Sequence, residues 1–214
     1  MGTRSAAGVS RMSDRTASMV DVGFALDGGT LPRDYRCALA DAIERSLPWL
    51  AGLPGAGMHR LNFSAGDGPD LLLSRRTLLR LRVPRERAGD AAALAGSDLL
   101  VGSRRLHVDS PRERELLPHG TLYAHIVAAE DSDEGAFLNA IQAELALLGV
   151  ACRPICGRRQ VCEGGLLQGF SLMLDGLTIE DSLRVLESGL GAHRRLGCGM
   201  FVAHRSAAAV GASH

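Results

Sequence analysis

The chain has 214 residues, 46% of them hydrophobic and 4% aromatic, and its 24 basic and 24 acidic residues give no net charge. This length suits one large domain or two domains of about 100 residues each. The scarcity of aromatic residues argues against a platform of stacked rings, a device of many single-strand-binding proteins. Zero net charge argues against a dedicated nucleic-acid binder. However, every basic residue is arginine, whose planar guanidinium suits phosphate groups.

The first half of the chain predicts one strand–helix–strand–strand–helix–strand unit. Residues 1–18 lack apolar periodicity and are expected to form a disordered tail. Pro32 suits the first turn of a helix, in which apolar residues recur at helical spacing as far as Leu50. The other expected elements are a strand over 20–26, a short strand over 58–63, a hairpin of strands 71–74 and 78–83, a helix over 84–95 and a strand within 99–108. We therefore predict an N-terminal domain over residues 19–110.

The second half repeats this order. Thr178 begins the second of its two helices, and both helices have acidic first turns, which suit the helix dipole. The expected elements are a strand over 122–128, a helix over 133–148, strands over 151–155, 158–161 and 169–174, a helix over 178–187 and a last strand over 200–202. We predict a C-terminal domain over 118–205 and an α+β fold of tandem ferredoxin-like domains, β-α-β-β-α-β repeated. Such a fold does not by itself define a function.

A glycine- and arginine-rich loop occupies residues 189–199, with the sequence GLGAHRRLGCG. Glycine lets the backbone approach a phosphate closely and adopt positive φ, and exposed backbone N–H groups form an anion-binding concavity. The spacing is neither that of a Walker A loop nor that of a dinucleotide-binding loop. The alternative is a glycine-rich helix exit before an edge strand. The predicted RNA-binding residues of the loop are Gly189, Gly191, His193, Arg194, Arg195, Gly197 and Gly199.

Arginines also gather in two other segments. Residues 71–88 contain six arginines and one acid, and a further arginine pair occurs in the second half. Such clusters bind phosphates with a steep salt dependence, although any single arginine could equally belong to a solvated strand. The predicted RNA-binding residues here are Arg75, Arg76, Arg80, Arg158 and Arg159.

The chain has five cysteines, and three of them lie between residues 152 and 162. Their spacing does not match the usual zinc-binding pairs and no fourth ligand is obvious, so we predict free thiols rather than zinc, and no metal or other cofactor. No apolar run resembles a signal peptide or reaches the length of a membrane span. These features predict a cytoplasmic protein with reduced thiols.

Several motifs occur in an order that resembles a known family. GFSLMLDGL at 169–177, followed by LGCGMF at 196–201, resembles the C-terminal signature of the CRISPR-associated endoribonucleases of the RAMP superfamily, which process precursor CRISPR RNA. The segments TLP at 30–32, LPWL at 47–50, GMH at 57–59 and LLLSRRT at 71–77 resemble the subgroup first defined from myxobacterial type I systems. The resemblance covers residues 20–205.

This resemblance implies two ferredoxin-like domains and metal-independent cleavage of repeat RNA, which leaves a 2′,3′-cyclic phosphate and a 5′-hydroxyl. It implies CRISPR repeat RNA, mature crRNA and other subunits of a type I effector complex as partners. Two alternatives remain open. The chain could be a non-catalytic RNA-binding subunit of such a complex, or an unrelated ferredoxin-like metabolic or regulatory domain that does not bind RNA.

The family places its catalytic histidine on the first helix or just after it, where this chain has His59. A histidine can act as general base or acid near neutral pH. Arg60 would stabilise charge in the transition state, and Tyr35 is a weaker catalytic candidate. The structural alternatives are a strand-start histidine and a half-buried core tyrosine. The chain has no lysine, and arginine cannot serve as a general acid, so the acid is unassigned. His125 alternates with apolar residues and could face a cleft between the domains.

Overall fold

The computed structural model describes residues 16–63, 70–74, 76–130 and 132–204. The first sheet contains the strand β1 (Met19–Asp27). Its side chains alternate between the two faces of the sheet, and Val20, Val22 and Phe24 are buried on one of them. The sheet is antiparallel with the order β3-β5-β1-β7-β6. Its other elements are α1 (Arg36–Ser46), β3 (Gly57–Met58), β5 (Leu78–Pro84), α2 (Ala88–Ala92), β6 (Asp98–Val101) and β7 (Arg104–Glu115).

The second sheet has the order β11-β8-β10-β9 and is also antiparallel. Side-chain caps begin both of its helices: Asp133 accepts a hydrogen bond from the Ala136 N–H, and Thr178 accepts one from the Asp181 N–H. Its elements are β8 (Thr121–Ala128), α3 (Glu134–Leu147), β9 (Arg153–Cys162), β10 (Leu167–Asp175), α4 (Ile179–Ser188) and β11 (Val202–Ala203).

Both sheets have the ferredoxin-like strand order, in which the fourth and third strands flank the first. In the first half, β7 and β5 flank β1. In the second half, β11 and β10 flank β8. The predicted tandem ferredoxin-like fold is therefore confirmed. The domain limits 19–110 and 118–205 stay a prediction, although β7 continues the first sheet to Glu115. Most of the predicted tail, 1–18, lies outside the described residues.

Three local predictions were wrong. Pro32 ends a short strand, β2 (Thr30–Pro32), and does not begin a helix. The expected hairpin over 71–83 does not form, because β4 (Asp70–Leu72) pairs with β2 while β5 pairs with β1 and β3. The two strands expected over 151–161 are one strand, β9. The register with β10 shifts by one residue beside Gly157, but the strand does not end there because β9 is paired with β10 on both sides of that glycine.

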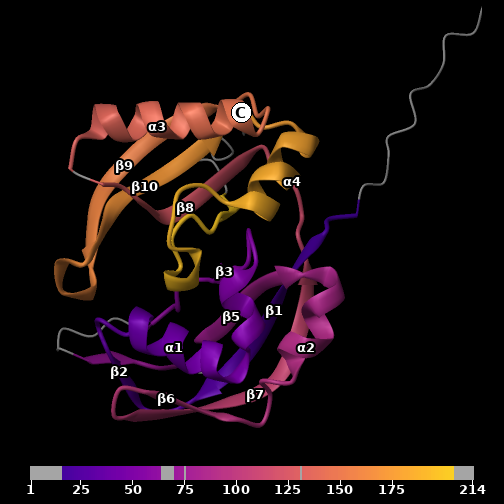
Figure 1. Ribbon diagram of the computed structural model, residues 1–214, viewed down its shortest axis with the longest axis vertical. Coiled ribbons are helices and arrows are strands. Elements are labelled where there is room, and N and C mark those ends of the chain that lie inside the picture. Colours follow the sequence, from indigo (N-terminus) through magenta and orange to yellow (C-terminus); the bar gives the residue numbers. More distant parts are fainter. Residues whose placement is uncertain (1–15, 64–69, 75, 131, 205–214) are drawn as a thin grey trace, which may run out of the picture.

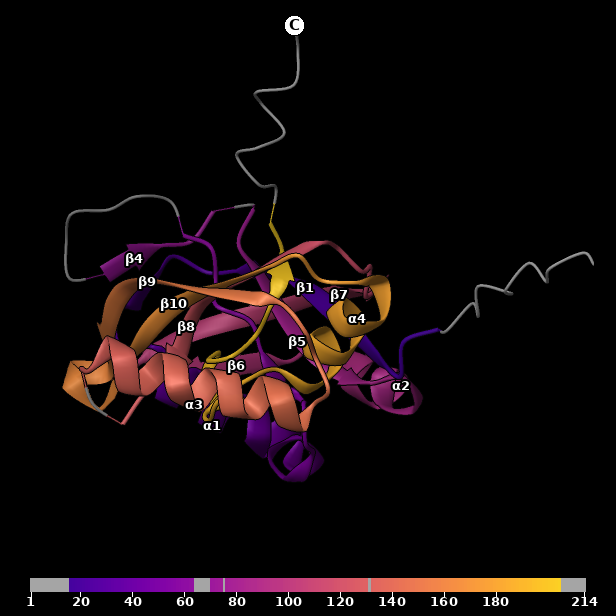
Figure 2. The ribbon, with the colours of Figure 1, turned by 90° about the horizontal axis from the view of Figure 1, so that it is seen from above.

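The helices lie on one side of the two sheets, as α1 and α3 show in Figures 1 and 2, and the opposite sheet faces are left uncovered by helices. One apolar core extends through both halves. No helix among the described residues combines the length and apolarity needed to cross a membrane.

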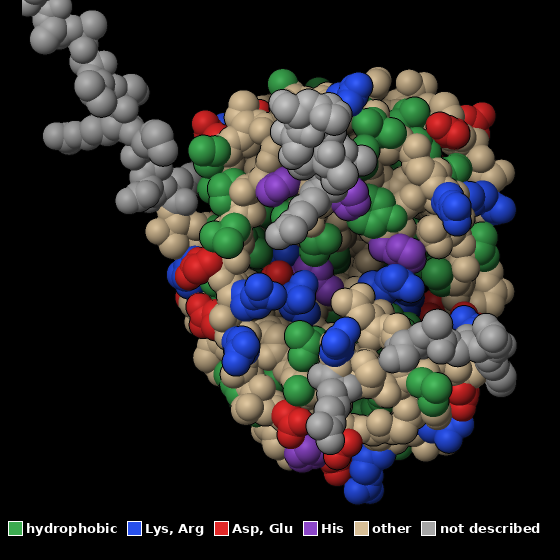
Figure 3. Space-filling view, turned by 180° about the vertical axis from the view of Figure 1, so that it is seen from behind, with side chains coloured by type: hydrophobic (Ala, Val, Ile, Leu, Met, Phe, Trp, Pro, Cys, Tyr) green, Lys and Arg blue, Asp and Glu red, His purple; other side chains and the backbone are tan. Residues whose placement is uncertain are grey.

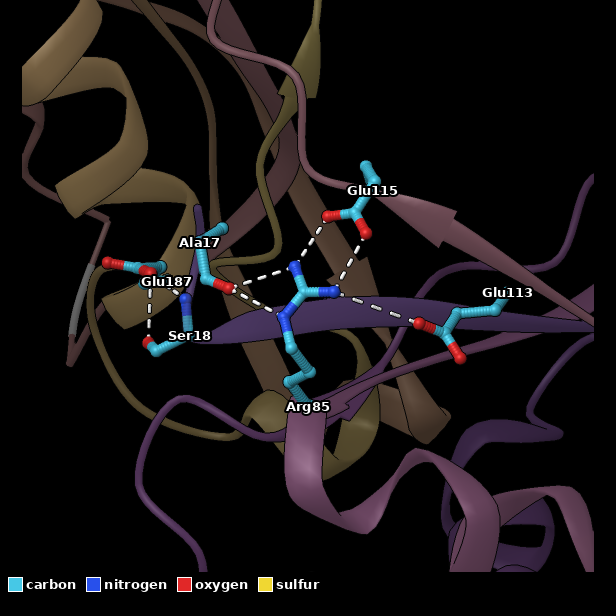
Figure 4. A network of polar contacts seen from close by, with 6 residues as sticks. All are labelled: Ala17, Ser18, Arg85, Glu113, Glu115 and Glu187. Atoms are coloured by element: carbon cyan, nitrogen blue, oxygen red, sulfur yellow. Dashed lines mark hydrogen bonds and ion pairs between the residues drawn. The ribbon is translucent and has the colours of Figure 1, made fainter. Parts of the chain in front are cut away.

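Polar contacts fasten the two halves together at the start of β1. Figure 4 shows the Ser18 N–H and hydroxyl donating to Glu187 on α4, at 2.5 and 2.8 Å. Beside them Arg85 donates to the Ala17 carbonyl and to the carboxylate of Glu115. The Ser18–Glu187 bonds join the start of β1 to α4 of the second half, whereas the Arg85 bonds lie within the first half.

Candidate functional site

Two rows of polar side chains cross the open face of the first sheet. The strand register aligns Arg82, Asp21 and Arg114 in one row. Successive residues of a strand point to opposite faces, so these side chains lie opposite the core residues of β1. The next row consists of Arg80, Gly23 and Arg112. Four arginines therefore share this face with one acid.

The acids that alternate with these arginines point to the other face. Glu113 and Glu115 lie beside Arg85, as Figure 4 shows, and Arg85 pairs closely with Glu115. Within the part of the chain that the structure describes, the side chains of Arg112 and Arg114 form no ion pair or hydrogen bond. Neither arginine was predicted from the sequence as a binding residue. The alternation Arg-Glu-Arg-Glu within one strand was the signal that could have found them.

Arg80, a predicted RNA-binding residue, likewise forms no side-chain hydrogen bond or ion pair among the described residues. Its pKa is lowered because the guanidinium is partly buried and lies near Arg114 and Arg82, against a partial compensation from Asp21. This surface therefore carries positive charge that the protein does not neutralise, which is the property of an anion-binding site.

A buried arginine joins this face to the second half of the chain. Arg82 is only 2% exposed, and its Nε and Nη2 donate to the two carboxylate oxygens of Asp21 at 2.8 and 3.1 Å. Its Nη1 donates to the carbonyl oxygens of Leu186 and Phe201, at 2.8 and 3.1 Å. All of these donors are satisfied, so the arginine holds Asp21 in place.

His59 completes this network. Its backbone N–H donates to the Arg80 carbonyl, which extends β3 by one residue, and its Nε2 lies 3.2 Å from Asp21 Oδ1. Burial lowers the pKa of His59 more than Asp21 raises it, so the imidazole is neutral at pH 7. Burial raises the pKa of Asp21, but His59 and Arg82 outweigh that effect and the carboxylate stays ionised. A neutral His59 therefore donates from Nε2 to Asp21 and keeps a lone pair on Nδ1.

His125, from the second half of the chain, lies near Arg60, the residue that follows His59. It lies half-buried on β8, and burial together with the charges of Arg60 and Arg36 lowers its pKa to about 4. Arg60 itself is exposed. Figure 3 shows arginine and histidine side chains around a hollow between the two halves, on the side away from the helices.

Acid should weaken the fold through His125. Its pKa of about 4 in the folded protein lies below the ordinary 6.5, so the unfolded chain binds the proton more readily and stability is lost as pH falls from 6.5 towards 4. We expect a lower denaturant midpoint at pH 5 than at pH 7, and a smaller decrease in His125→Asn. An equal decrease in this variant would show that His125 is not the source.

The glycine-rich loop docks beside His59. A Cβ on Gly197 would lie 3.2 Å from the Met58 carbonyl oxygen and 3.4 Å from the Arg60 nitrogen. A Cβ on Gly57 would lie 2.4 Å from the Arg194 carbonyl oxygen. Only glycine permits backbones to approach this closely. The loop and His59 are far apart in sequence, but they form neighbouring parts of one site.

The two arginines of the loop are engaged by the protein itself. Arg194 donates to the carbonyl oxygens of Ser188 and Gly191, at 2.6 and 2.8 Å. Arg195 pairs with Asp41 and Glu44 on α1 and is 39% exposed. Their roles in RNA binding stay a prediction, and their observed role is to shape the loop and hold it against α1.

The other loop residues have the conformations that a tight turn requires. His193 has φ of 64°, and its carbonyl accepts hydrogen bonds from the N–H groups of Leu196 and Cys198. Its side chain is exposed. The glycines with positive φ in this loop are Gly189, Gly191, Gly197 and Gly199.

Tyr35 lies in the core rather than in the hollow. It is 3% exposed, and its hydroxyl oxygen accepts a hydrogen bond from the Leu61 N–H at 3.0 Å. Its ring meets Phe63 edge to face at 5.2 Å. Burial raises the pKa of the hydroxyl. This geometry agrees with the core alternative, and a catalytic role of Tyr35 stays a prediction.

The remaining predicted residues are on the surface or outside the described chain. Arg76, Arg158 and Arg159 are exposed, and Arg159 donates to Gln168 at 3.0 Å. Arg75 lies outside the described residues. The five cysteines are unpaired, and the described residues contain no cluster of three or more potential metal ligands.

Glu163, which the sequence did not suggest, caps a helix of the other half. Its carboxylate accepts hydrogen bonds from the backbone N–H groups of Arg36 and Cys37, at 2.9 and 3.2 Å, where α1 has no side-chain cap of its own. The Arg36 guanidinium donates to the Leu196 carbonyl at 2.6 Å. The first turn of α1 is thus bound to both the β9–β10 connection and the loop.

Removing this cap should destabilise the protein. In Glu163→Ala the buried Arg36 N–H and the partly buried Cys37 N–H lose their acceptor, at a cost of about 1–3 kcal/mol in the free energy of unfolding. Glu163→Gln keeps one acceptor oxygen, so it should lose less. Denaturant unfolding of both variants tests this. Equal stability of Glu163→Ala and the natural chain would contradict the capping role.

The fold consists of two ferredoxin-like halves. It carries unneutralised arginines on one sheet face, beside the buried Asp21–His59 pair. These features define a candidate polyanion-binding protein with an acid–base site. The chain belongs to the Cas6 family: the family model described as Cas6 Crispr matches residues 20–206. The CRISPR-associated endonuclease Cas6 of Myxococcus xanthus (strain DK1622) is 36% identical over 194 residues, which cover 89% of this chain and 84% of that protein.

Solved structures agree on the fold. A CRISPR associated protein Cas6 superposes with a TM-score of 0.61 at 11% identity, covering 87% of this chain and 100% of that chain. A RAMP protein binding different RNA substrates superposes with a TM-score of 0.57 at 13% identity, covering 85% and 98%. The family resemblance expected from the sequence motifs is confirmed.

Proposed function

We propose that the chain is a metal-independent endoribonuclease that binds CRISPR repeat RNA and cleaves it to give mature crRNA. The observation that carries this is the Asp21–His59 pair beside the unneutralised arginines on the open sheet face. The name of the Myxococcus relative, a CRISPR-associated endonuclease, supports the same activity.

The cleavage step needs a base, an acid and positive charge. His59 Nδ1 takes the proton from a ribose 2′-hydroxyl, whose oxygen attacks the adjacent phosphorus. The bond from phosphorus to the 5′-oxygen breaks, which leaves a 2′,3′-cyclic phosphate and a 5′-hydroxyl. Arg60 and Arg80 stabilise the charge that develops on the phosphate oxygens.

We assign the role of general acid, for which the sequence suggested no residue, to His125. Its low pKa results partly from the positive charges of Arg60 and Arg36. Burial is the larger cause, but a bound phosphodiester opposes the arginine charges, raises the pKa and so favours the protonated imidazole that can protonate the leaving 5′-oxygen. Asp21 holds His59 in the tautomer that the reaction needs and does not itself react.

One observation favours the alternative of a non-catalytic RNA-binding subunit: the imidazole of His59 is only 8% exposed. The two functions separate in a single-turnover assay, in which purified protein in excess is mixed with labelled cognate repeat RNA. Cleavage at one position supports the nuclease. Intact RNA that remains bound supports the alternative, and no binding at all excludes both.

The remaining parts of the proposal concern partners and location. The arginine face and the glycine-rich loop retain the product RNA after the cut, and the chain remains with it as a subunit of a type I effector complex in the cytoplasm. Because the arginine contacts are electrostatic, affinity for RNA falls steeply with salt.

A further inference from the structure

An apolar strip crosses the open face of the second sheet. The register aligns Tyr123 on β8 with Val202 on β11 and with Met173 on β10, and Met173 with Ile155 on β9. All four residues are half-buried, in contrast to the fully buried Leu122 and Ala124 on the helix side of β8. The sheet therefore offers a partly exposed apolar surface on the side that holds the arginines and His59.

A small cavity of about 190 Å³ lies along this strip. Gly157 lines this cavity and leaves space because it has no side chain. A Cβ there would lie 2.4 Å from the Ser171 hydroxyl oxygen. At the far edge the exposed His204 places its ring 5.5 Å from that of Tyr123, tilted by 47°. The His204 N–H donates to the Thr121 carbonyl, which fixes this residue at the sheet edge.

We propose that this cavity binds one unpaired base of the RNA, stacked on the ring of Tyr123 beside His204. The inference rests on the proposed function, because it specifies where that RNA lies. A flat aromatic ring on an open antiparallel sheet recognises the π-face of a base, which every base has. The neighbouring arginines attract a polyanion to the same side of the molecule and so favour a nucleotide over an uncharged apolar ligand.

The place of Tyr123 links this base to the reaction. His125 lies two residues further along β8 on the same face, at about 6–7 Å in a strand. That separation is close to the spacing of adjacent nucleotides, so a base stacked on Tyr123 sets which phosphate reaches His125 and His59. The chain has only two tyrosines, and the other, Tyr35, is buried in the core. The low aromatic content predicted no stacking platform, but one ring at this position suffices for one base.

The test measures binding of cognate repeat RNA made entirely with 2′-O-methyl ribose, which lacks the attacking hydroxyl and is not cut. Tyr123→Phe keeps the ring and should bind within about twofold of the natural chain. Tyr123→Leu keeps apolar bulk without a ring, and Tyr123→Ala removes both, so each should bind roughly 5- to 100-fold more weakly. The denaturant midpoint of Tyr123→Leu, measured in parallel, separates lost stacking from lost folding.

A cross-link locates the base directly. The same RNA, with 5-iodouridine at one unpaired position at a time, is irradiated with the protein, and the modified peptide is identified by mass spectrometry. We expect one position to cross-link to Tyr123. Binding by Tyr123→Leu equal to that of the natural chain, or cross-links confined to other segments, would overturn the base site. Failure of the natural chain to bind the RNA would instead overturn the proposed function.

Discussion

Replacing His59 with alanine should lower the single-turnover rate of repeat RNA cleavage by about 10²–10⁴-fold, the usual contribution of general acid–base catalysis. The variant should still bind repeat RNA, because Arg80, Arg112 and Arg114 do not depend on the imidazole for their charge. On the acid side, the natural chain should lose activity only at a pH below 6.5, because burial lowers the pKa of His59 and a base must be unprotonated. Rates measured between pH 5 and 8 test this.

His107→Ala is the matched control for that experiment. His107 also lies beside an acid, 2.9 Å from Asp98, but on the β6–β7 hairpin with its side chain 46% exposed. Its loss should leave cleavage unchanged. Retained cleavage in a folded His59→Ala protein, with an unaltered denaturant midpoint, would refute the catalytic role of His59. A lowered midpoint together with lost binding would show instead that His59 supports the Asp21–Arg82 network.

The second large effect is expected from Gly199→Ala at the end of the glycine-rich loop. Gly199 has φ of 65°, and a Cβ there would lie within van der Waals overlap of the Leu190 carbonyl oxygen, at 1.9 Å. The positive φ and the overlap with the Leu190 carbonyl both involve backbone atoms, so a side-chain movement cannot relieve either of them. The left-handed conformation costs about 1–2 kcal/mol and the overlap about 1–3 kcal/mol more. We expect the free energy of unfolding to fall by about 2–5 kcal/mol.

Gly164→Ala isolates the conformational part of this cost. Gly164 has φ of 62°, nearly the same as Gly199, but a Cβ there would meet nothing within 4 Å. Denaturant unfolding of the two variants should therefore show a markedly larger loss for Gly199→Ala. Equal losses would mean that the close approach of Leu190 does not constrain the loop. Repeat RNA cleavage should fall in Gly199→Ala only, because this loop borders His59.

The elements that sequence predicted well are those with a strong local signal. The helices α3 and α4 begin at capping residues, Asp133 and Thr178, and their apolar spacing is regular. The three-residue strand β4 was assigned to the wrong partner because so short a segment carries no information on which strand it pairs with. The fold was nevertheless predicted correctly, because the same order of strands and helices occurs in both halves.

The site was harder to predict because its parts come from distant segments. His59 was found through its resemblance to a family motif. The role of Asp21 was hidden, because an acid that alternates with apolar residues looks like a solvent-facing strand position. Arg82 was counted among the arginines of its segment, and only the structure shows it buried against Leu186 and Phe201 of the other half. Glu163 could not be found from sequence, because it caps a helix more than 120 residues away.

The most direct test of the proposed activity is the chemistry of the RNA ends. Purified protein in excess is incubated with 5′-labelled cognate repeat RNA in EDTA, and the ends of the products are analysed. We expect one cut at the full rate, with a 2′,3′-cyclic phosphate on one fragment and a 5′-hydroxyl on the other. A requirement for a divalent cation, or a 5′-phosphate on the downstream fragment, would contradict cleavage by His59 and the ribose 2′-hydroxyl.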